Sequence, residues 1–234
     1  METYTTTFGQ TAAEALPQER AAFIRKTYAH LAGAIAVFVL LETILLGSGL
    51  GEMAARTMMG SSFSWFIVLA AFIGISTVAN SWAISQTSKS KQYLGLGLFT
   101  LAWAVMFLPL LFIINHFAGS SVIAQAGVVT LGLFLGITAV VFLTRKDFSF
   151  LGPILTIAGF VALGFIAINL IFGFSLGNVF AFAMVAFAGG SILYQTSNVL
   201  HQYRTDQHVA ASLSLFSSIA LMFWYILQIF YSRR

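Results

Sequence analysis

The feature that most constrains this chain is a series of apolar runs, each about 20 residues long, with short polar segments between them. A helix needs about 20 apolar residues, at about 1.5 Å rise each, to cross about 30 Å of hydrocarbon. A spanning β-barrel would instead show alternating segments of about ten residues. The sequence therefore predicts an all-α membrane protein with about seven transmembrane helices. The expected spans are about 30–50, 62–84, 93–114, 120–143, 150–172, 175–195 and 209–231.

The composition excludes a water-soluble surface. Only 8% of the residues are charged, compared with roughly 25% in soluble domains. The chain has no cysteine, which excludes disulfides and thiolate metal sites. The net charge of +4 comes from lysines and arginines at the ends of apolar runs, where such residues anchor headgroups and set topology. We therefore expect the lipid bilayer as the chain's surroundings and no nucleic-acid partner.

The charge distribution predicts the topology. Residues 1–28 are expected to form a mobile polar cytoplasmic tail, and residues 29–234 a single helical transmembrane domain. The positive-inside rule places the N-terminus in the cytoplasm. An odd number of spans then puts the C-terminus outside, but the final two arginines favour the cytoplasm, so its side stays open. On the N-terminal side lie Arg20, Arg25, Lys26, Lys89, Lys91, Arg145, Lys146 and Arg204; on the other lie Arg56, Arg233 and Arg234.

The last apolar run is the most polar of the spans. It contains Ser212, Ser214, Ser217 and Ser218, and hydroxyls in a membrane helix favour contact with other helices over contact with lipid. We therefore expect this helix at the centre of the bundle, with the other six around it.

Glu42 is the one acidic side chain expected well inside a span. An ionisable group at that depth is costly and is a functional candidate by default. Glu42 is expected to face a cavity, to form an ion pair with Arg56 just beyond the helix end, or to stay protonated. The alternative is that Glu42 lies close enough to the headgroups to reach water.

The other polar groups in the spans do not suggest catalysis. Gln195, Asn198 and Gln228 are neutral and are expected to bond neighbouring helices. The four histidines fall at span ends or in loops, where no Ser–His pair or zinc cluster forms in the bilayer. We expect no enzyme, no metal site and no cofactor.

Three strings identify a resemblance. They are FIRKTY at Phe23–Tyr28, TRKDFSFLG at Thr144–Gly152, and ILYQTSNVLH at Ile192–His201. In these strings, and in the number and order of its spans, the chain resembles the Bax inhibitor-1 family, most closely its bacterial YccA branch.

The resemblance implies a fold of six helices around a central seventh. In some members it also implies a pH-gated calcium leak, in which two aspartates share a proton. The matching positions here are Gln195 and Ser218, which do not titrate, so that switch is expected to be absent. An arginine common late in the last helix of that branch is Gln228 here.

The YccA branch implies a second function. We expect a non-enzymatic protein of the bacterial inner membrane that binds and modulates the FtsH membrane protease in quality control. The alternative is a calcium or cation leak without the aspartate pair. For that alternative the candidate pore or polar-core residues are Glu42, Gln195, Ser218, Asn198 and Gln228, with Arg56 as the candidate ion-pair partner of Glu42.

Overall fold

The computed structural model of the chain describes residues 10–59, 62–85, 88–173 and 176–233. Seven of the helices in these residues are long and apolar enough to cross a membrane. The expected all-α fold with seven spans is therefore confirmed. The helices are α1 (Pro17–Gly47), α2 (Leu50–Met59), α3 (Ser62–Ala83), α4 (Lys89–Phe117), α5 (Ser120–Thr144), α6 (Leu151–Phe172), α7 (Gly177–His201) and α8 (His208–Ser232).

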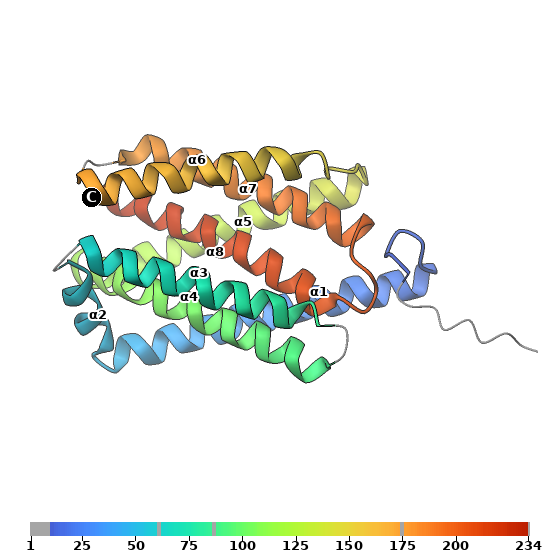
Figure 1. Cartoon of the computed structure of the whole chain (residues 1–234), viewed down its shortest axis with the longest axis horizontal. Coiled ribbons are helices and arrows are strands. Elements are labelled where there is room, and N and C mark those ends of the chain that lie inside the picture. The colour runs from blue at the N-terminus through green and yellow to red at the C-terminus, as the bar shows by residue number, and fades with distance from the viewer. Residues whose placement is uncertain (1–9, 60–61, 86–87, 174–175, 234) are drawn as a thin grey trace, which may run out of the picture.

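The spans run alongside one another, and their connections lie at two opposite ends (Figure 1). One end, here the N-terminal end, holds the starts of α1 and α4, the end of α3, and the α5–α6 and α7–α8 connections. The other, the C-terminal end, holds α2, the α4–α5 connection, the end of α6, the start of α7 and the end of α8. This arrangement separates the charges as expected among the described residues, while the cytoplasmic position of the N-terminal end stays a prediction.

Helix α8 forms the centre of the bundle. In its most apolar stretch 61% of the residues are buried, whereas in α3 and in α6 the share is 6%. It packs against α1, α3, α4, α5 and α7, and α6 lies outside against α7 (Figure 1). Of the four serines that marked this helix as a central one, Ser212 and Ser218 are buried and Ser214 and Ser217 are half-buried, in agreement with a helix that packs against protein.

Aromatic side chains join α8 to α1 and α4. Phe38 of α1 meets Phe107 of α4 edge to face, with 5.2 Å between ring centroids, and meets Phe216 of α8 at 6.0 Å. Phe107 also stacks on Phe223 of α8 at 5.4 Å. Edge-to-face and offset pairs of this kind add to the packing energy of the buried area.

The start of α1 differs from the prediction. The helix begins at Pro17, and Phe23 and Thr27 on it are buried, so residues 17–28 are not a tail. Proline at the first helical turn has a suitable φ and lacks only a donor that would be unpaired there. Arg25 and Lys26 were interpreted as the boundary between the tail and the first span, because they are charged. The helix instead runs through both residues.

Residues 10–15 are also held in place. The Ala12 amide donates to the Tyr203 carbonyl at 2.9 Å, and the Thr205 amide donates to the Gln10 carbonyl at 3.3 Å. The Arg20 guanidinium donates to the carbonyls of Ala12 and Ala13. The expected mobile tail is therefore corrected for residues 10–28, and residues 1–9 lie outside the described residues.

Candidate functional site

Glu42 lies on the buried face of α1, one turn after Phe38. Its side chain is 5% exposed, and neither carboxylate oxygen has a hydrogen-bond partner. Because α1 packs against α4 and α8 through this face, Glu42 is inside the bundle. This burial is compatible with the expectation that Glu42 faces a cavity or stays protonated, and both stay predictions.

Arg56 does not pair with Glu42. Its guanidinium lies 2.5 Å from the carboxylate of Glu52, one turn earlier in α2, and both side chains are exposed. The sequence contains the signal for this contact, since opposite charges four residues apart on a helix face each other. The proposed Glu42–Arg56 ion pair is corrected to Glu52–Arg56.

The four neutral candidates lie on α7 and α8. Asn198 is buried, Gln195 and Gln228 are half-buried, and the side-chain oxygens of Gln195 and Asn198 have no partner. Ser218 is buried and donates to the Ser214 carbonyl in its own helix at 3.2 Å. Among the described residues Ser218 bonds within its own helix and the Gln195 side-chain oxygen has no partner, so positions 195 and 218 are not a hydrogen-bonded pair.

A second set of buried polar atoms lies where α1, α5 and α7 meet. The Tyr28 hydroxyl is close to the hydroxyls of Thr138 and Thr196, but it forms no well-aligned hydrogen bond with either. Thr27 is fully buried, and its hydroxyl has no partner. Buried polar groups are rarely left unpaired, so this cluster is unusual in the core of a bundle.

The second and third family strings meet at the N-terminal end. The Ser197 hydroxyl of α7 accepts from the Phe148 amide at 2.9 Å and donates to Asp147 Oδ1 at 3.3 Å. The same Asp147 oxygen accepts from the Ser149 amide at 2.9 Å. The α5–α6 connection is thereby fastened to the last turns of α7. We refer to Asp147, Ser197 and His201 as the loop latch.

The loop latch has the residue types of a hydrolase but not the arrangement. His201 Nδ1 lies 3.0 Å from the Ser197 carbonyl and 3.5 Å from its hydroxyl, and Ser197 stands between His201 and Asp147. In a catalytic triad the histidine stands between serine and carboxylate. The Ser149 amide, followed by nearby His201 and Ser197, holds the pKa of Asp147 below its usual value, as expected for a carboxylate that fixes a loop.

Sequence reasoning did not identify the loop latch as a unit. Asp147 and Ser197 are about 50 residues apart, and no periodicity connects a loop to a distant helix. The sequence did contain one signal, because the two strings at Thr144–Gly152 and Ile192–His201 include all three latch residues.

Two histidines from different helices meet near the same end. The rings of His30 in α1 and His208 in α8 have centroids 4.9 Å apart. His30 also stacks on Tyr93 of α4 at 5.5 Å, and its Nε2 lies 3.3 Å from the Tyr93 hydroxyl. No group of three or more metal-ligating side chains occurs in the part of the chain that the structure describes.

Comparison with known proteins agrees with the fold and the strings. A family model described as inhibitor of apoptosis-promoting Bax1 matches residues 20–234. Bax inhibitor 1 of Schizosaccharomyces pombe is 32% identical over 224 residues, covering 93% of this chain and 79% of the relative. An uncharacterized protein of Pseudomonas aeruginosa is 32% identical over 197 residues, covering 82% of this chain and 85% of the relative.

More distant relatives extend the similarity to plants. Protein LIFEGUARD 4 of Arabidopsis thaliana is 28% identical over 220 residues, covering 92% of this chain and 86% of the relative. The family match includes all seven spans from within α1 to the end of α8. Taken with the helical bundle around α8 and the two strings that meet in the loop latch, this match establishes that the chain belongs to the Bax inhibitor-1 family of membrane proteins.

Proposed function

We propose that this chain is a cation leak, with Ca²⁺ as the ion to test and Glu42 as the acidic side chain within the bundle. The observation that carries the proposal is that Glu42 is buried and has no partner for either oxygen. A charged side chain at such a depth costs roughly 2.5–3.5 kcal/mol on insertion scales. An apolar residue would pack there without that cost, so the carboxylate is better explained by binding of a cation or proton.

Further oxygens support a polar route through the bundle. The unpartnered hydroxyls of Thr27, Tyr28, Thr138 and Thr196 lie nearer the N-terminal end than Glu42 does. Oxygen ligands are those that Ca²⁺ prefers. Phe38, which contacts rings of α4 and α8, lies between these oxygens and Glu42. The oxygens would therefore give a cation transient ligands on the other side of Phe38 from Glu42.

The route is closed in this conformation. Between Thr27 and Glu42 the buried face of α1 carries Leu31, Ala34 and Phe38, and Phe38 is in contact with rings from α4 and α8. Apolar constrictions of this kind close pores by excluding water. Opening would require α1 to move relative to α4 and α8.

Proteoliposomes with a Ca²⁺-sensitive dye inside provide the test. We expect Ca²⁺ influx with the unmodified protein and its loss in Glu42→Gln, which keeps the shape of the side chain and removes its charge. The matched control is Glu52→Gln, because Glu52 is exposed and paired with Arg56. Silent liposomes, or equal influx in the Glu42 variant and the unmodified protein, would show the proposal to be wrong.

The pH dependence of influx would distinguish this leak from that of the family members in which two aspartates share a proton. Glutamine and serine at positions 195 and 218 carry no proton that titrates between about pH 5 and 8. Influx should therefore change little over this range through these positions. A steep change of influx with pH would mean that another titratable group, Glu42 or one of the histidines, is the pH sensor.

We also propose a second function: non-enzymatic binding and modulation of an FtsH-type protease, in a bacterial inner membrane with the N-terminus in the cytoplasm. The observation in favour is the fastening of residues 10–15 to the α7–α8 connection and to Arg20. A protease that pulls on the N-terminus must first break these contacts, which would slow its degradation of this chain.

Copurification in mild detergent tests this second function. The tagged protein should enrich an FtsH-type protease, and Arg20→Ala should shorten its half-life in cells by freeing the segment. Arg25→Ala is the control, because Arg25 is exposed on the same helix. Absence of the protease from the purified material, with the half-life unchanged in the Arg20 variant, would exclude it.

A further inference from the structure

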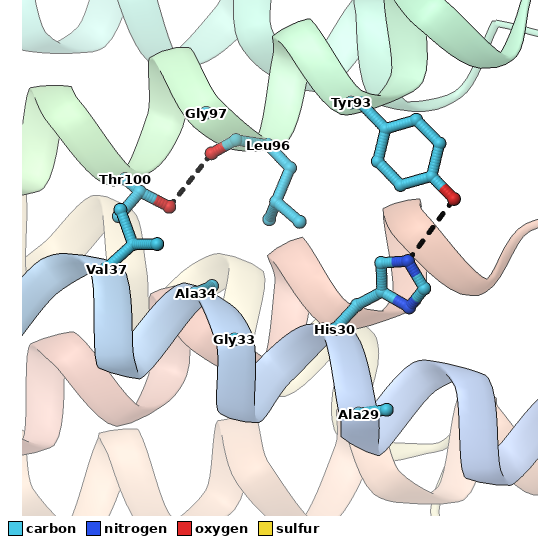
Figure 2. A pocket seen from close by; sticks show the side chains of 9 residues that line it. All are labelled: Ala29, His30, Gly33, Ala34, Val37, Tyr93, Leu96, Gly97 and Thr100. Carbon is cyan, nitrogen blue, oxygen red and sulfur yellow. Dashed lines mark hydrogen bonds between the residues drawn. The ribbon is translucent and has the colours of Figure 1, made fainter.

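A groove of about 380 Å³ runs between α1 and α4 and opens on the outer face of the bundle. Figure 2 shows its two walls, with Gly33, Ala34 and Val37 on α1 opposite Leu96, Gly97 and Thr100 on α4. Apart from His30 and Tyr93, the residues that line the groove carry one polar side-chain group, the Thr100 hydroxyl. This hydroxyl donates to the Leu96 carbonyl of its own helix at 2.9 Å. The floor of the groove is thus apolar.

Two glycines keep the groove open. At Gly33 and at Gly97 an added Cβ would meet nothing within 4 Å, so neither glycine is needed for contact between the helices. Gly95, on the same helix as Gly97, is different because a Cβ there would lie 2.5 Å from the Ala79 carbonyl oxygen. The space along Gly33 and Gly97 is therefore free for a molecule from outside the chain.

The groove has a polar end. His30 and Tyr93 lie there, joined between Nε2 and the hydroxyl at 3.3 Å (Figure 2). His30 Nδ1 is 2.7 Å from the Lys26 carbonyl, and the ring of His208 lies beside His30. These groups belong to the N-terminal end of the bundle, where the apolar span gives way to the charged connections.

Two lysines lie close to this polar end, Lys26 one turn before His30 in α1 and Lys89 one turn before Tyr93 in α4. Lys26 and Lys89 are exposed, and both lie close enough to His208 to act on it electrostatically. Asp206 is the nearby acidic group, and its carboxylate is already paired with Arg204 at 3.0 Å. The groove therefore has an apolar body and a cationic head with aromatic and imidazole hydrogen-bonding groups.

We propose that this groove is a binding site for one anionic phospholipid, with an acyl chain along Gly33 and Gly97 and the phosphate at Lys26, Lys89, His30 and Tyr93. The geometry that points to it is an apolar groove, open to the membrane, that ends between lysines from two helices. Basic pockets between spans at a membrane surface are a recognised form of lipid headgroup binding. This site is separate from Glu42 and does not depend on the proposed leak.

Lipid retention in native mass spectrometry tests the site. The purified full chain is titrated in detergent with phosphatidylglycerol and, separately, with phosphatidylcholine of the same acyl chains. We expect one phosphatidylglycerol to be retained more tightly than phosphatidylcholine. Equal retention of the two lipids would refute the proposal.

Two double variants test the two parts of the site. Lys26→Gln with Lys89→Gln should weaken phosphatidylglycerol binding by about 25-fold, since each lysine near an anionic headgroup contributes about fivefold. Phosphatidylcholine retention should not change in this variant. The control is Lys91→Gln with Lys146→Gln, because Lys91 lies about 200° around the helix from Lys89. A loss of similar size in the control would contradict the site.

Gly33→Leu with Gly97→Leu should fill the groove and reduce retention of both lipids. Gly74→Leu with Gly164→Leu is the matched control, because both are exposed helical glycines whose added Cβ would also meet nothing within 4 Å. If the groove variant instead loses a dimer while keeping phosphatidylglycerol, the groove receives a second copy and the proposal is wrong. Glycerol phosphate alone should bind weakly, and binding as tight as that of the whole lipid would also overturn it.

Discussion

Replacement of Gly95 by alanine should disturb the closest approach between two helices in the bundle. A Cβ at this position would lie 2.5 Å from the Ala79 carbonyl oxygen and 2.8 Å from the Ala83 amide nitrogen. Both are backbone atoms of α3 and do not rotate away. Reaching ordinary contact at 3.4 Å requires α3 and α4 to separate by about 0.9 Å, which loosens the packing on either side of the contact.

The magnitude follows from a comparison with Gly97→Ala. Both variants gain about 1 kcal/mol of helix propensity, but only the Gly95 variant has the clash, since nothing lies within 4 Å of a Cβ at Gly97. Overpacking of this kind costs about 1–3 kcal/mol. The difference between the two variants in free energy of unfolding should therefore be about 1–3 kcal/mol, with Gly95→Ala the less stable.

Thermal unfolding in mild detergent, followed by tryptophan fluorescence, measures this difference. Trp82 lies at the contact, with its Cβ 3.1 Å from the added methyl position, so the probe reports on the affected helices. At about 2–4 °C per kcal/mol for a chain of this size, the midpoint of Gly95→Ala should lie about 2–12 °C below that of Gly97→Ala. Equal midpoints would refute the close approach of α3 and α4.

Three further results are expected. Glu42→Leu should raise the unfolding midpoint and abolish Ca²⁺ influx, because unpaired buried oxygens each cost about 1–3 kcal/mol; a lower midpoint in fluorescence-monitored unfolding would mean that Glu42 has a partner. Hydrogen bonds hold the pKa of Asp147 below its usual value, so its stabilisation is present above about pH 4 and is lost as the pH falls further. Midpoints measured between pH 5 and 3 should therefore fall less steeply in Asp147→Asn than in the unmodified protein. Because the chain has no cysteine, an impermeant maleimide added to intact cells should label Ser120→Cys but not Ser90→Cys, and the reverse pattern would invert the topology.

The spans and the central helix were predictable because each depends on a local property. Hydropathy reports whether lipid surrounds a segment, and the serines of α8 report contact with protein in place of lipid. For Glu42 the sequence left two positions open, inside the bundle or near the headgroups, and its burial was settled only by the packing of α1 against α4 and α8. The number of spans and the central place of α8 were therefore predicted correctly, whereas the start of α1 was not.

The pairings were not predictable because they depend on packing. The bond between Asp147 and Ser197 joins a loop to a helix about 50 residues away. The contact at Gly95 depends on which face of α4 meets α3, which the weak amphipathicity of membrane spans does not reveal. Arg56 shows the reverse case, since its true partner Glu52 was one helical turn away.

The two ends of the bundle have different constraints, and this bears on how it opens. At the N-terminal end, the loop latch and the Thr11–Arg204 bridge connect α1, α5, α7 and their neighbours. Glu42 lies beyond the Phe38 contacts toward the other end, where α1 is followed by the short α2. A motion that lets a cation reach Glu42 breaks fewer side-chain bonds if it begins at the C-terminal end. Cross-linking α1 to α4 near that end should therefore suppress influx more than a cross-link at the N-terminal end does.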